Sequence, residues 1–468
     1  MEFKNEHKAV DFLGVERSLC MLILLISSLA LSCSSSANSQ QPQQPNILVI
    51  VADDAGWNDV GYQGSEIETP SIDSLAASGV ALDRFYVAPT CSPTRAAFLT
   101  GMPASRMGIV APISGRSTKA LPDSITTLPQ ALQQAGYQTA LMGKWHLGLQ
   151  PQSGPGAYGF DYSYGFLHGQ IDQYTHNYKN GDASWHRNGK MIEEEGHATD
   201  LITRESIDWL TQKRDPESPF FLQVAYSAPH TPLQEEEKWK ARYKGIISDT
   251  SRLDYAAAMT HMDAGIGQIM DVLKQEGLEE NTLVLFMSDN GAQEGWDPDW
   301  QYDGKFGPNP TLGSNKPLRD WKTSNYEGGI RVPAVLYWKG HLSAGTVSHL
   351  ISVTDWMPTF LELAGMEEQP NSIEGQDVWP LLSGEKQQWK RDIYIRGHLQ
   401  ESLINRKWKM IRTRHKEKDP EYELYQLADD PQETKNVMEE YPQKAAEMKK
   451  KLKQEFAKDA DSVNYTIN

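Results

Sequence analysis

The hydrophobic positions of the chain gather in short, nearly continuous apolar runs. The runs 46–51, 220–225 and 282–287 are rich in β-branched, aromatic and leucine side chains. Such a run is typical of a strand that is buried on both faces of a parallel sheet. Segments with helical periodicity, 127–135, 198–212 and 252–275, lie between these runs. Strands that alternate with helices predict an α/β fold, in which helices cover both faces of the sheet.

The pattern changes near residue 384. Segments 392–396, 402–413 and 421–427 have the pattern of short strands joined by turns, and 442–458 has that of a Lys/Glu-rich helix. We therefore predict an α/β domain over 46–383 and a small C-terminal α+β subdomain with an antiparallel sheet over 384–468.

The N-terminal region has the pattern of an export signal. Residues 19–31 form a mostly apolar run that is too short to span a bilayer and is typical of a signal-peptide core. Cys33 follows a small residue, as at a bacterial lipoprotein cleavage site, where it would become the lipidated first residue. We predict a lipoprotein-type signal peptide over 1–33 and a flexible Ser, Gln and Pro-rich tether over 34–45. The protein is then exported as a periplasmic or cell-surface lipoprotein, with ordinary secretion as the alternative.

The charge balance of the chain bears on which classes of molecule it can bind. The chain has 45 basic and 62 acidic residues, a formal net charge of −17. This excess of acid argues against capture of nucleic acid by the overall field of the protein. An anionic substrate must instead be held by a local cluster of cations. The three cysteines exclude a disulfide framework, and Cys91 alone lies in the part that is expected to fold.

Acidic pairs follow two of the predicted strands. Asp53 and Asp54 come after the first strand, and Asp289 and Asn290 come after the run 282–287. In a parallel sheet, ligands gather outside the carboxyl ends of the strands. Oxygen-only ligands favour a hard cation, and Ca²⁺ suits them better than Mg²⁺ because its coordination shell is larger and less demanding. Helix capping and turn formation are the structural alternative for each pair.

The segment 89–101 contains Cys91, Pro93 and Arg95 at Cys-x-Pro-x-Arg spacing. A lone cysteine is more often a small buried hydrophobe than a nucleophile, but this segment resembles the signature of type I sulfatases. In that family the cysteine is converted to formylglycine by a formylglycine-generating enzyme or an anaerobic sulfatase-maturating enzyme. The resemblance continues, in the family's order, through 143–148, 228–230, 288–291, 317–329 and 424–436.

This resemblance implies a fold and a set of residue roles. The implied fold is an alkaline-phosphatase-like sandwich with a large mixed, mostly parallel central sheet. The implied nucleophile is one hydroxyl of the hydrated formylglycine at position 91, and the second hydroxyl later expels sulfate. The implied metal ligands are Asp53, Asp54, Asp289, Asn290 and the modified Cys91. Arg95 would hold the diol or a metal ligand, and His146 would act as a base. The groups that would contact the sulfate or the leaving oxygen are Lys144, His230 and Lys322.

Segments 164–176, 354–359 and 375–379 are most similar to arylsulfatase B-like enzymes and bacterial polysaccharide sulfatases. The implied substrates are sulfated oligosaccharides from glycosaminoglycans, ulvan or carrageenan. Candidate sugar contacts are His168, Asp172, His176 and Arg319. Two alternatives remain: a phosphate or phosphonate ester hydrolase of the same superfamily, and a non-catalytic glycan-binding lipoprotein if Cys91 is not modified.

Overall fold

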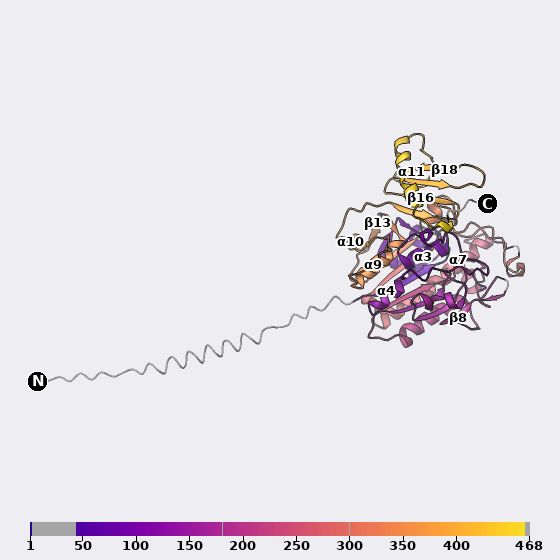
Figure 1. Ribbon diagram of the computed structural model, residues 1–468. Coiled ribbons are helices and arrows are strands. Elements are labelled where there is room, and N and C mark those ends of the chain that lie inside the picture. Colours follow the sequence, from indigo (N-terminus) through magenta and orange to yellow (C-terminus); the bar gives the residue numbers. More distant parts are fainter. Residues whose placement is uncertain (2–43, 180, 299, 464–468) are drawn as a thin grey trace. The chain divides into compact units, whose positions relative to one another are not determined.

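The computed structural model describes residue 1 and residues 44–179, 181–298 and 300–463 (Figure 1). Its contacts divide the chain into Met1–Gln43 and Gln44–Asn468, and the fold below is that of the second unit. The predicted signal peptide, its predicted lipidation site Cys33 and most of the predicted tether lie outside the described residues. Within the described ranges, no helix is both long and apolar enough to cross a membrane.

Ten strands of the described residues form one mixed sheet, and its five central strands are parallel. The predicted strands 46–51, 220–225 and 282–287 are neighbours at its centre. The flanking strands are mostly antiparallel, which confirms the predicted mixed architecture. In spatial order they are β13 (Gly345–Val347), β2 (Val80–Leu82), β12 (Ala334–Tyr337), β11 (Thr282–Ser288), β1 (Asn46–Ala52), β10 (Phe220–Ala225), β4 (Gln138–Lys144), β5 (Tyr162–Phe166), β8 (Trp185–Arg187) and β9 (Lys190–Met191).

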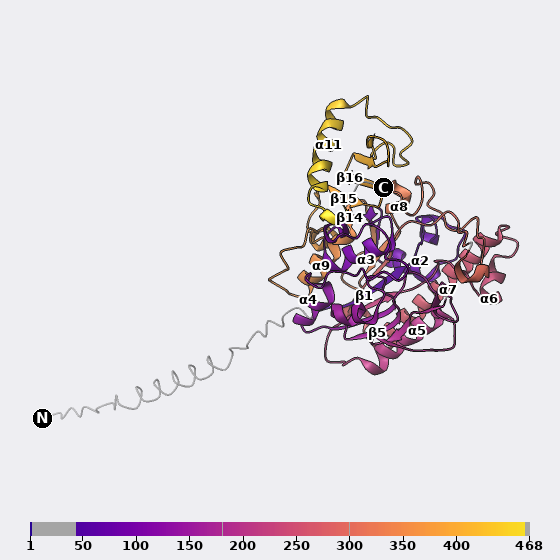
Figure 2. The same cartoon turned by 45° about the vertical axis from the view of Figure 1, so that its right-hand side comes forward.

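Two hydrophobic cores lie on opposite faces of this sheet. In β1, Ile47, Val49 and Val51 pack into one core, and Leu48, Ile50 and Ala52 pack into the other. Because successive side chains of a strand point to opposite faces, a strand covered on both sides is apolar at most positions. The first core contains α3 (Cys91–Thr100), α4 (Leu128–Gln134) and α9 (Trp356–Leu363); the second contains α2 (Pro70–Ser78), α5 (Ala198–Asp208) and α7 (Thr250–Gln275) (Figure 2).

The predicted helices form where polar side chains cap their first turns. Thr127 and Gln130 form a capping box at the start of α4, and the Asp249 side chain accepts the amide hydrogen of Arg252 at the start of α7. Helix α5 continues into a π-helical turn, Trp209–Lys213. The predicted ranges 127–135, 198–212 and 252–275 therefore agree with the structure to within about a turn.

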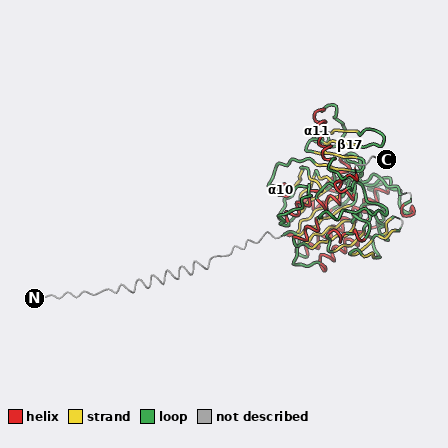
Figure 3. The backbone as a smooth tube through the Cα atoms, in the orientation of Figure 1, coloured by secondary structure: helices red, strands yellow, loops and turns green. Residues whose placement is uncertain are grey.

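The C-terminal region forms a four-stranded antiparallel sheet, with α11 (Pro442–Phe456) against β16 and β17 (Figure 3). One expectation was wrong: the segment 402–413 is a hairpin, not one strand. The Asn405 side chain accepts the amide hydrogens of Lys407 and Trp408, and so closes a tight turn. The strands are β15 (Ile393–Arg396), β16 (Gln400–Ile404), β17 (Lys409–Thr413) and β18 (Glu421–Tyr425).

Shorter elements complete the described part of the chain. β3 (Phe85–Tyr86) pairs with β14 (Ile351–Ser352), and β6 (Asn177–Tyr178) pairs with β7 (Asp182–Ala183). Short helices are α6 (Glu237–Lys240), α8 (Glu327–Ile330) and α10 (Trp379–Leu382).

The register of the central strands gathers the residues that follow them. Ala52 of β1 pairs with Ser288 of β11. Ala225 of β10 pairs with Val51 of β1 and with Gly143 of β4. The carboxyl ends of these four parallel strands therefore meet at one edge of the sheet.

Candidate active site

The two acidic pairs meet at this edge. Asp53 and Asp54 directly follow β1, and Asp289 and Asn290 directly follow β11. The amide of Asp54 donates to Asp289 Oδ1 at 3.3 Å, and Asn290 Nδ2 donates to Asp54 Oδ1 at 2.7 Å. Asp53, Asp289 and Asn290 are fully buried. Two pairs separated by more than 200 residues in the sequence thus form one cluster of oxygen atoms.

Helix α3 brings Cys91 and Arg95 to the same cluster. The helix begins at Cys91, after the extended residue Thr90. Arg95 lies one turn later, and its Nη2 and Nε lie 2.6 and 3.1 Å from Asp289 Oδ2. Its Nη1 donates to the carbonyl of Lys144 at 3.0 Å. Arg95 therefore joins the first turn of α3 to the ends of β11 and β4.

His146 is oriented as a proton acceptor toward residue 91. Its Nε2 lies 2.8 Å from the carbonyl oxygen of Ile113, and its Nδ1 lies 3.1 Å from Cys91 Sγ. Since a carbonyl oxygen only accepts, Nε2 carries the hydrogen and the Nδ1 lone pair faces Cys91. Burial, with Lys144 and Arg95 nearby, holds the pKa of His146 well below its usual value. The imidazole is therefore neutral and suited to act as a base.

Two lysines and a histidine also contact the acidic cluster. Lys144, the last residue of β4, lies with its Nζ 2.5 Å from Asp53 Oδ2 and is fully buried. Lys322 Nζ lies 2.7 Å from the carboxylate of Asp54, and His230 Nε2 lies 3.6 Å from it. The site thus holds permanent cations beside the aspartates, as recognition of an anionic group requires.

The protonation of these groups follows from burial and charge. Burial and the neighbouring aspartates raise the pKa of Asp53 to about 7, against the effect of Lys144. Burial acts in the same direction on Asp54, but Lys322 and His230 outweigh it and hold the pKa of Asp54 below its usual range. Burial lowers the pKa of His230 to about 3, and Lys322 and Lys144 act in the same direction. The charges of Asp54 and Asp289 raise the pKa of Asp53 because the three carboxylates repel one another inside the protein.

The oxygen cluster fits a hard cation. Asp53 Oδ1 and Asn290 Oδ1 are buried and accept no hydrogen bond from any described residue. Buried polar atoms normally have a partner, and a cation between the carboxylates would both supply one and remove their repulsion. The donor set of three carboxylates and one amide oxygen suits Ca²⁺ or Mg²⁺ better than a metal that prefers nitrogen or sulfur.

The histidines predicted to contact the sugar have local partners. His168 Nδ1 lies 2.8 Å from Ser184 Oγ, and its ring stacks on Tyr178 with the ring centres 4.4 Å apart. His176 stacks on Trp185, also at 4.4 Å, and its Nε2 lies 3.0 Å from the carbonyl oxygen of Gly196. Both side chains are buried. They belong to the packing of the loop that follows β5.

The other two candidate sugar contacts are also engaged. Asp172 Oδ1 accepts the amide hydrogens of Tyr174 and Thr175. Arg319 Nη1 donates to Tyr425 Oη at 3.0 Å and to the carbonyl of Glu433 at 2.8 Å. Arg319 therefore contacts the C-terminal region.

Two residues that position His146 were not among the candidates named from the sequence. A Cβ added to Gly169 would lie 2.4 Å from Cε1 and 2.6 Å from Nε2 of the His146 ring. Ser92 Oγ donates to the carbonyl of His146 at 2.8 Å and accepts the amide hydrogen of Ile113. Gly169 carries no chemical signal of its own, whereas the position of Ser92 next to Cys91 could have identified it.

Models of two known protein families match this chain. A family model described as "Sulfatase" matches residues 45–366, and one described as "N-sulphoglucosamine sulphohydrolase, C-terminal" matches residues 320–461. Arylsulfatase J of Mus musculus is 36% identical over 74% of this chain and 57% of its own length. N-acetylgalactosamine-6-sulfatase of Mus musculus is 33% identical over 81% of this chain and 72% of its own length. This chain thus covers little more than half of the first of these relatives.

A solved structure is similar over almost its whole length. It is described as Ps i-CgsB in complex with k-i-k-neocarrahexaose, and it superposes with a TM-score of 0.81 at 31% identity. The match covers 90% of this chain and 94% of the other. The similarity therefore includes both the α/β domain and the C-terminal sheet.

Proposed function

Because the chain belongs to the sulfatase family, we propose that it hydrolyses the sulfate esters of sulfated carbohydrates. The observation that carries this proposal is that the Asp53–Asp54 and Asp289–Asn290 pairs meet at one edge of the sheet, where Arg95, one turn after Cys91 in α3, contacts Asp289. The related structure with a bound carrageenan hexasaccharide supports a carbohydrate substrate. Glycosaminoglycan, ulvan and carrageenan oligosaccharides are the proposed classes.

Charge balance supports a cation in this mechanism. Arg95, Lys144 and Lys322 offset the three aspartates, so these groups alone offer no surplus of positive charge to a sulfate ester. We propose that Asp53, Asp54, Asp289 and Asn290, together with residue 91, hold Ca²⁺. Bound there, the ion would polarise the sulfate and lower the pKa of the attacking hydroxyl. Lys144, Lys322 and His230 would then bind the remaining sulfate oxygens.

The orientation of His146 supports a two-step cycle. Maturation of Cys91 to formylglycine, by a formylglycine-generating or anaerobic sulfatase-maturating enzyme, supplies two hydroxyls on one carbon after hydration. One hydroxyl oxygen bonds to sulfur as the ester S–O bond breaks, and one of the two lysines, Lys144 or Lys322, gives a proton to the departing alcohol. His146 Nδ1 then takes the proton of the second hydroxyl, so that the aldehyde re-forms and sulfate leaves.

The test compares the matured protein with its Cys91→Ser variant. Intact mass establishes conversion of Cys91, and sulfate release is measured on chondroitin, dermatan, ulvan and carrageenan oligosaccharides beside an aryl sulfate and a phosphate ester. We expect sulfate release only from the matured wild type, and a folded but inactive variant. A protein that carries formylglycine and releases no sulfate, or that prefers the phosphate ester, would contradict the proposal.

The cation is tested separately. After removal of bound metal by a chelator, we expect sulfate release to stop and calcium to restore it better than magnesium or zinc. Asp289→Asn should weaken calcium binding, measured by calorimetry, because it removes one charge from the cluster. Full activity in protein shown to contain no metal would refute the cation's role.

Export rests on the N-terminal sequence alone. We propose that residues 1–33 direct export, that Cys33 is lipidated and anchors the protein to a membrane, and that 34–45 forms the tether. Radiolabelled palmitate should enter the wild type and not the Cys33→Ala variant, which should appear in the soluble fraction. Equal labelling of both would contradict the lipid anchor.

A further inference from the structure

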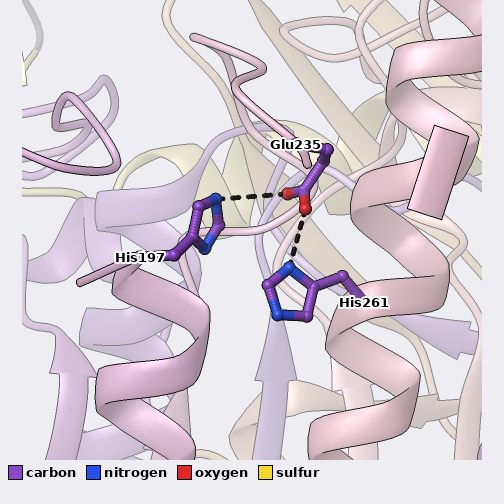
Figure 4. Close-up of side chains that lie close together, drawn as sticks. All are labelled: His197, Glu235 and His261. Atoms are coloured by element: carbon purple, nitrogen blue, oxygen red, sulfur yellow. Dashed lines mark hydrogen bonds and ion pairs between the residues drawn. The ribbon is translucent and has the colours of Figure 1, made fainter. Parts of the chain in front are cut away.

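A second cluster of metal-binding side chains lies outside the strand-end site. It consists of His197, Glu235 and His261, whose donor atoms all lie within 4.8 Å of one another (Figure 4). His197 caps the start of α5, Glu235 lies in the loop before α6, and His261 lies in the middle of α7. Their exposed fractions are 3%, 8% and 3%. Three separate elements thus direct nitrogen and oxygen donors to one buried point.

The Glu235 carboxylate lies near both histidines of the cluster. Glu235 Oε2 lies 2.7 Å from His261 Nδ1, and Glu235 Oε1 lies 3.5 Å from His197 Nε2. His197 Nε2 is buried and has no hydrogen-bond partner among the described residues. The Trp239 ring stacks on His261, and the Tyr174 ring meets His197 edge-on. Aromatic rings therefore shield the cluster.

A second carboxylate orients His261. Asp200 Oδ1 lies 3.0 Å from His261 Nε2, so Nε2 is engaged and Nδ1 faces Glu235. A metal-binding histidine usually donates its other ring hydrogen to a carboxylate or carbonyl, which fixes the ring and strengthens it as a ligand. The Asp200–His261 pair has this arrangement.

The charge of the cluster favours a cation. The buried Glu235 carboxylate lies between the two imidazoles, and the exposed Asp200 carboxylate contacts His261 from the other side. A divalent ion that replaced the proton on His261 Nδ1 would balance both carboxylates.

We propose that His197 Nε2, Glu235 and His261 Nδ1 form a binding site for a zinc-type divalent transition metal, separate from the catalytic centre. Two imidazoles and one carboxylate are a ligand set of zinc rather than of calcium. Binding releases the proton on His261 Nδ1. Without metal, His197 Nδ1 accepts the amide hydrogen of Thr199 at 3.2 Å, so the ring proton lies on Nε2. Binding of the metal at Nε2 moves this proton to Nδ1 and breaks that hydrogen bond.

The site would have a structural role. It joins α5 and α7, which pack in the same core, to the loop that runs from His230 to Glu235. A metal there would restrain the segment that carries His230 of the strand-end site. The inference does not depend on the proposed sulfatase activity.

The test measures metal binding directly. The full chain is stripped with a chelator and titrated with Zn²⁺ and with Co²⁺, whose visible absorption reports tetrahedral nitrogen and oxygen coordination. We expect one zinc-displaceable Co²⁺ with this spectrum in the wild type and in Asp289→Asn, which disturbs only the catalytic cluster. His197→Ala and His261→Ala should weaken this binding at least 100-fold, and Asp200→Asn should weaken it about 10- to 100-fold.

Thermal unfolding provides the second measurement. Zinc should raise the Tm of the wild type and of His341→Ala, an exposed histidine that serves as the control, and should not raise that of His197→Ala or His261→Ala. If His261→Ala does not fold, His197→Gln takes its place. Absence of the tetrahedral Co²⁺ spectrum, or the same zinc affinity in the wild type and the His197 variants, would overturn the proposal. The cluster would then be held by the hydrogen bonds of its side chains, without a metal.

Discussion

At the scale of single residues, the position of the His146 ring depends on Gly169, which has no Cβ. Gly169 lies against the His146 ring so closely that any side chain would overlap it. The ring is also held by Ile113 at Nε2 and faces Cys91 at Nδ1. A small rotation of this ring would therefore move its basic nitrogen away from residue 91.

We expect Gly169→Ala to lower kcat about 10- to 100-fold while the protein stays folded, because a misplacement of about 1 Å at a reacting group costs a factor of this size. The measurement is turnover of an aryl sulfate together with thermal unfolding. Gly156→Ala is the matched control, since a Cβ there meets no atom within 4 Å. Equal activity of the two variants would show that the loop yields without moving His146.

His168 tests whether the same loop recognises the sugar. Its side chain bonds Ser184 and stacks on Tyr178, so His168→Ala should loosen the loop wall without removing a group that touches sulfur. We expect kcat/KM to fall roughly tenfold more for sulfated oligosaccharides than for a small aryl sulfate, because contacts remote from the reacting bond align a large substrate. Steady-state kinetics on both substrates decide the matter. Equal losses would mean that the loop supports the active site in general and does not recognise the sugar.

At the scale of elements, a buried ion cluster ties the C-terminal sheet to the segment that carries Lys322. Lys409 of β17 lies 3.0 Å from Glu327 and 2.8 Å from Glu433, and all three side chains are buried. Glu433 also accepts the amide hydrogen of Glu327 at 2.6 Å. Glu327 begins α8, five residues after Lys322. The C-terminal sheet thereby supports the segment that carries Lys322.

Lys409→Met should lower the free energy of unfolding by about 3–5 kcal/mol near neutral pH, because it leaves the buried Glu433 carboxylate without a cation, whereas Glu327 keeps Arg331 at 3.6 Å. Urea unfolding measures the change. Lys451→Met, which removes an ion pair with Asp392 near the surface, is the control and should cost less than about 1 kcal/mol. Adding Glu433→Gln to Lys409→Met should restore part of the loss. A Lys409 variant as stable as the Lys451 variant would show that the cluster contributes little.

At the scale of the whole molecule, buried neutral histidines make stability depend on pH. His186 of β8 is fully buried, its Nε2 is without a partner among the described residues, and burial lowers its pKa from about 6.5 to about 4. Between these values the unfolded chain binds a proton that the folded chain does not. Stability is therefore lost as the pH falls through this range.

His186→Gln should remove this dependence. Relative to the wild type, the variant should gain up to roughly 3 kcal/mol of unfolding free energy between pH 7 and pH 4, at 1.36 kcal/mol for each pKa unit. Denaturant unfolding at several pH values gives the difference, with His341→Gln as the exposed control. Parallel pH profiles for the wild type and His186→Gln would contradict this origin of acid sensitivity.

Much of the fold could be predicted from local patterns. The runs 46–51 and 282–287 are apolar at every position after their first residue because both faces of these strands are covered. The hairpin within 402–413 was missed because its turn depends on the side chain of one asparagine. Strand β4, which ends at Lys144, was not predicted either. Its seven residues include Gln, Thr, Gly and Lys, and a strand of mixed composition has a weaker signal than a continuous apolar run.

From the sequence alone we could predict that the two acidic pairs lie at one edge of the sheet. Parallel strands present their carboxyl ends together, so acidic pairs after two such strands must meet. The pairing of the side chains follows from the three-dimensional packing: Lys144 with Asp53, Arg95 with Asp289, and His146 with Cys91 on one side and Gly169 on the other. This packing alone brought His197, Glu235 and His261 together. These contacts join residues far apart in the chain, and the paths of the loops and helices between them follow from the packing of the whole core, which no local pattern records.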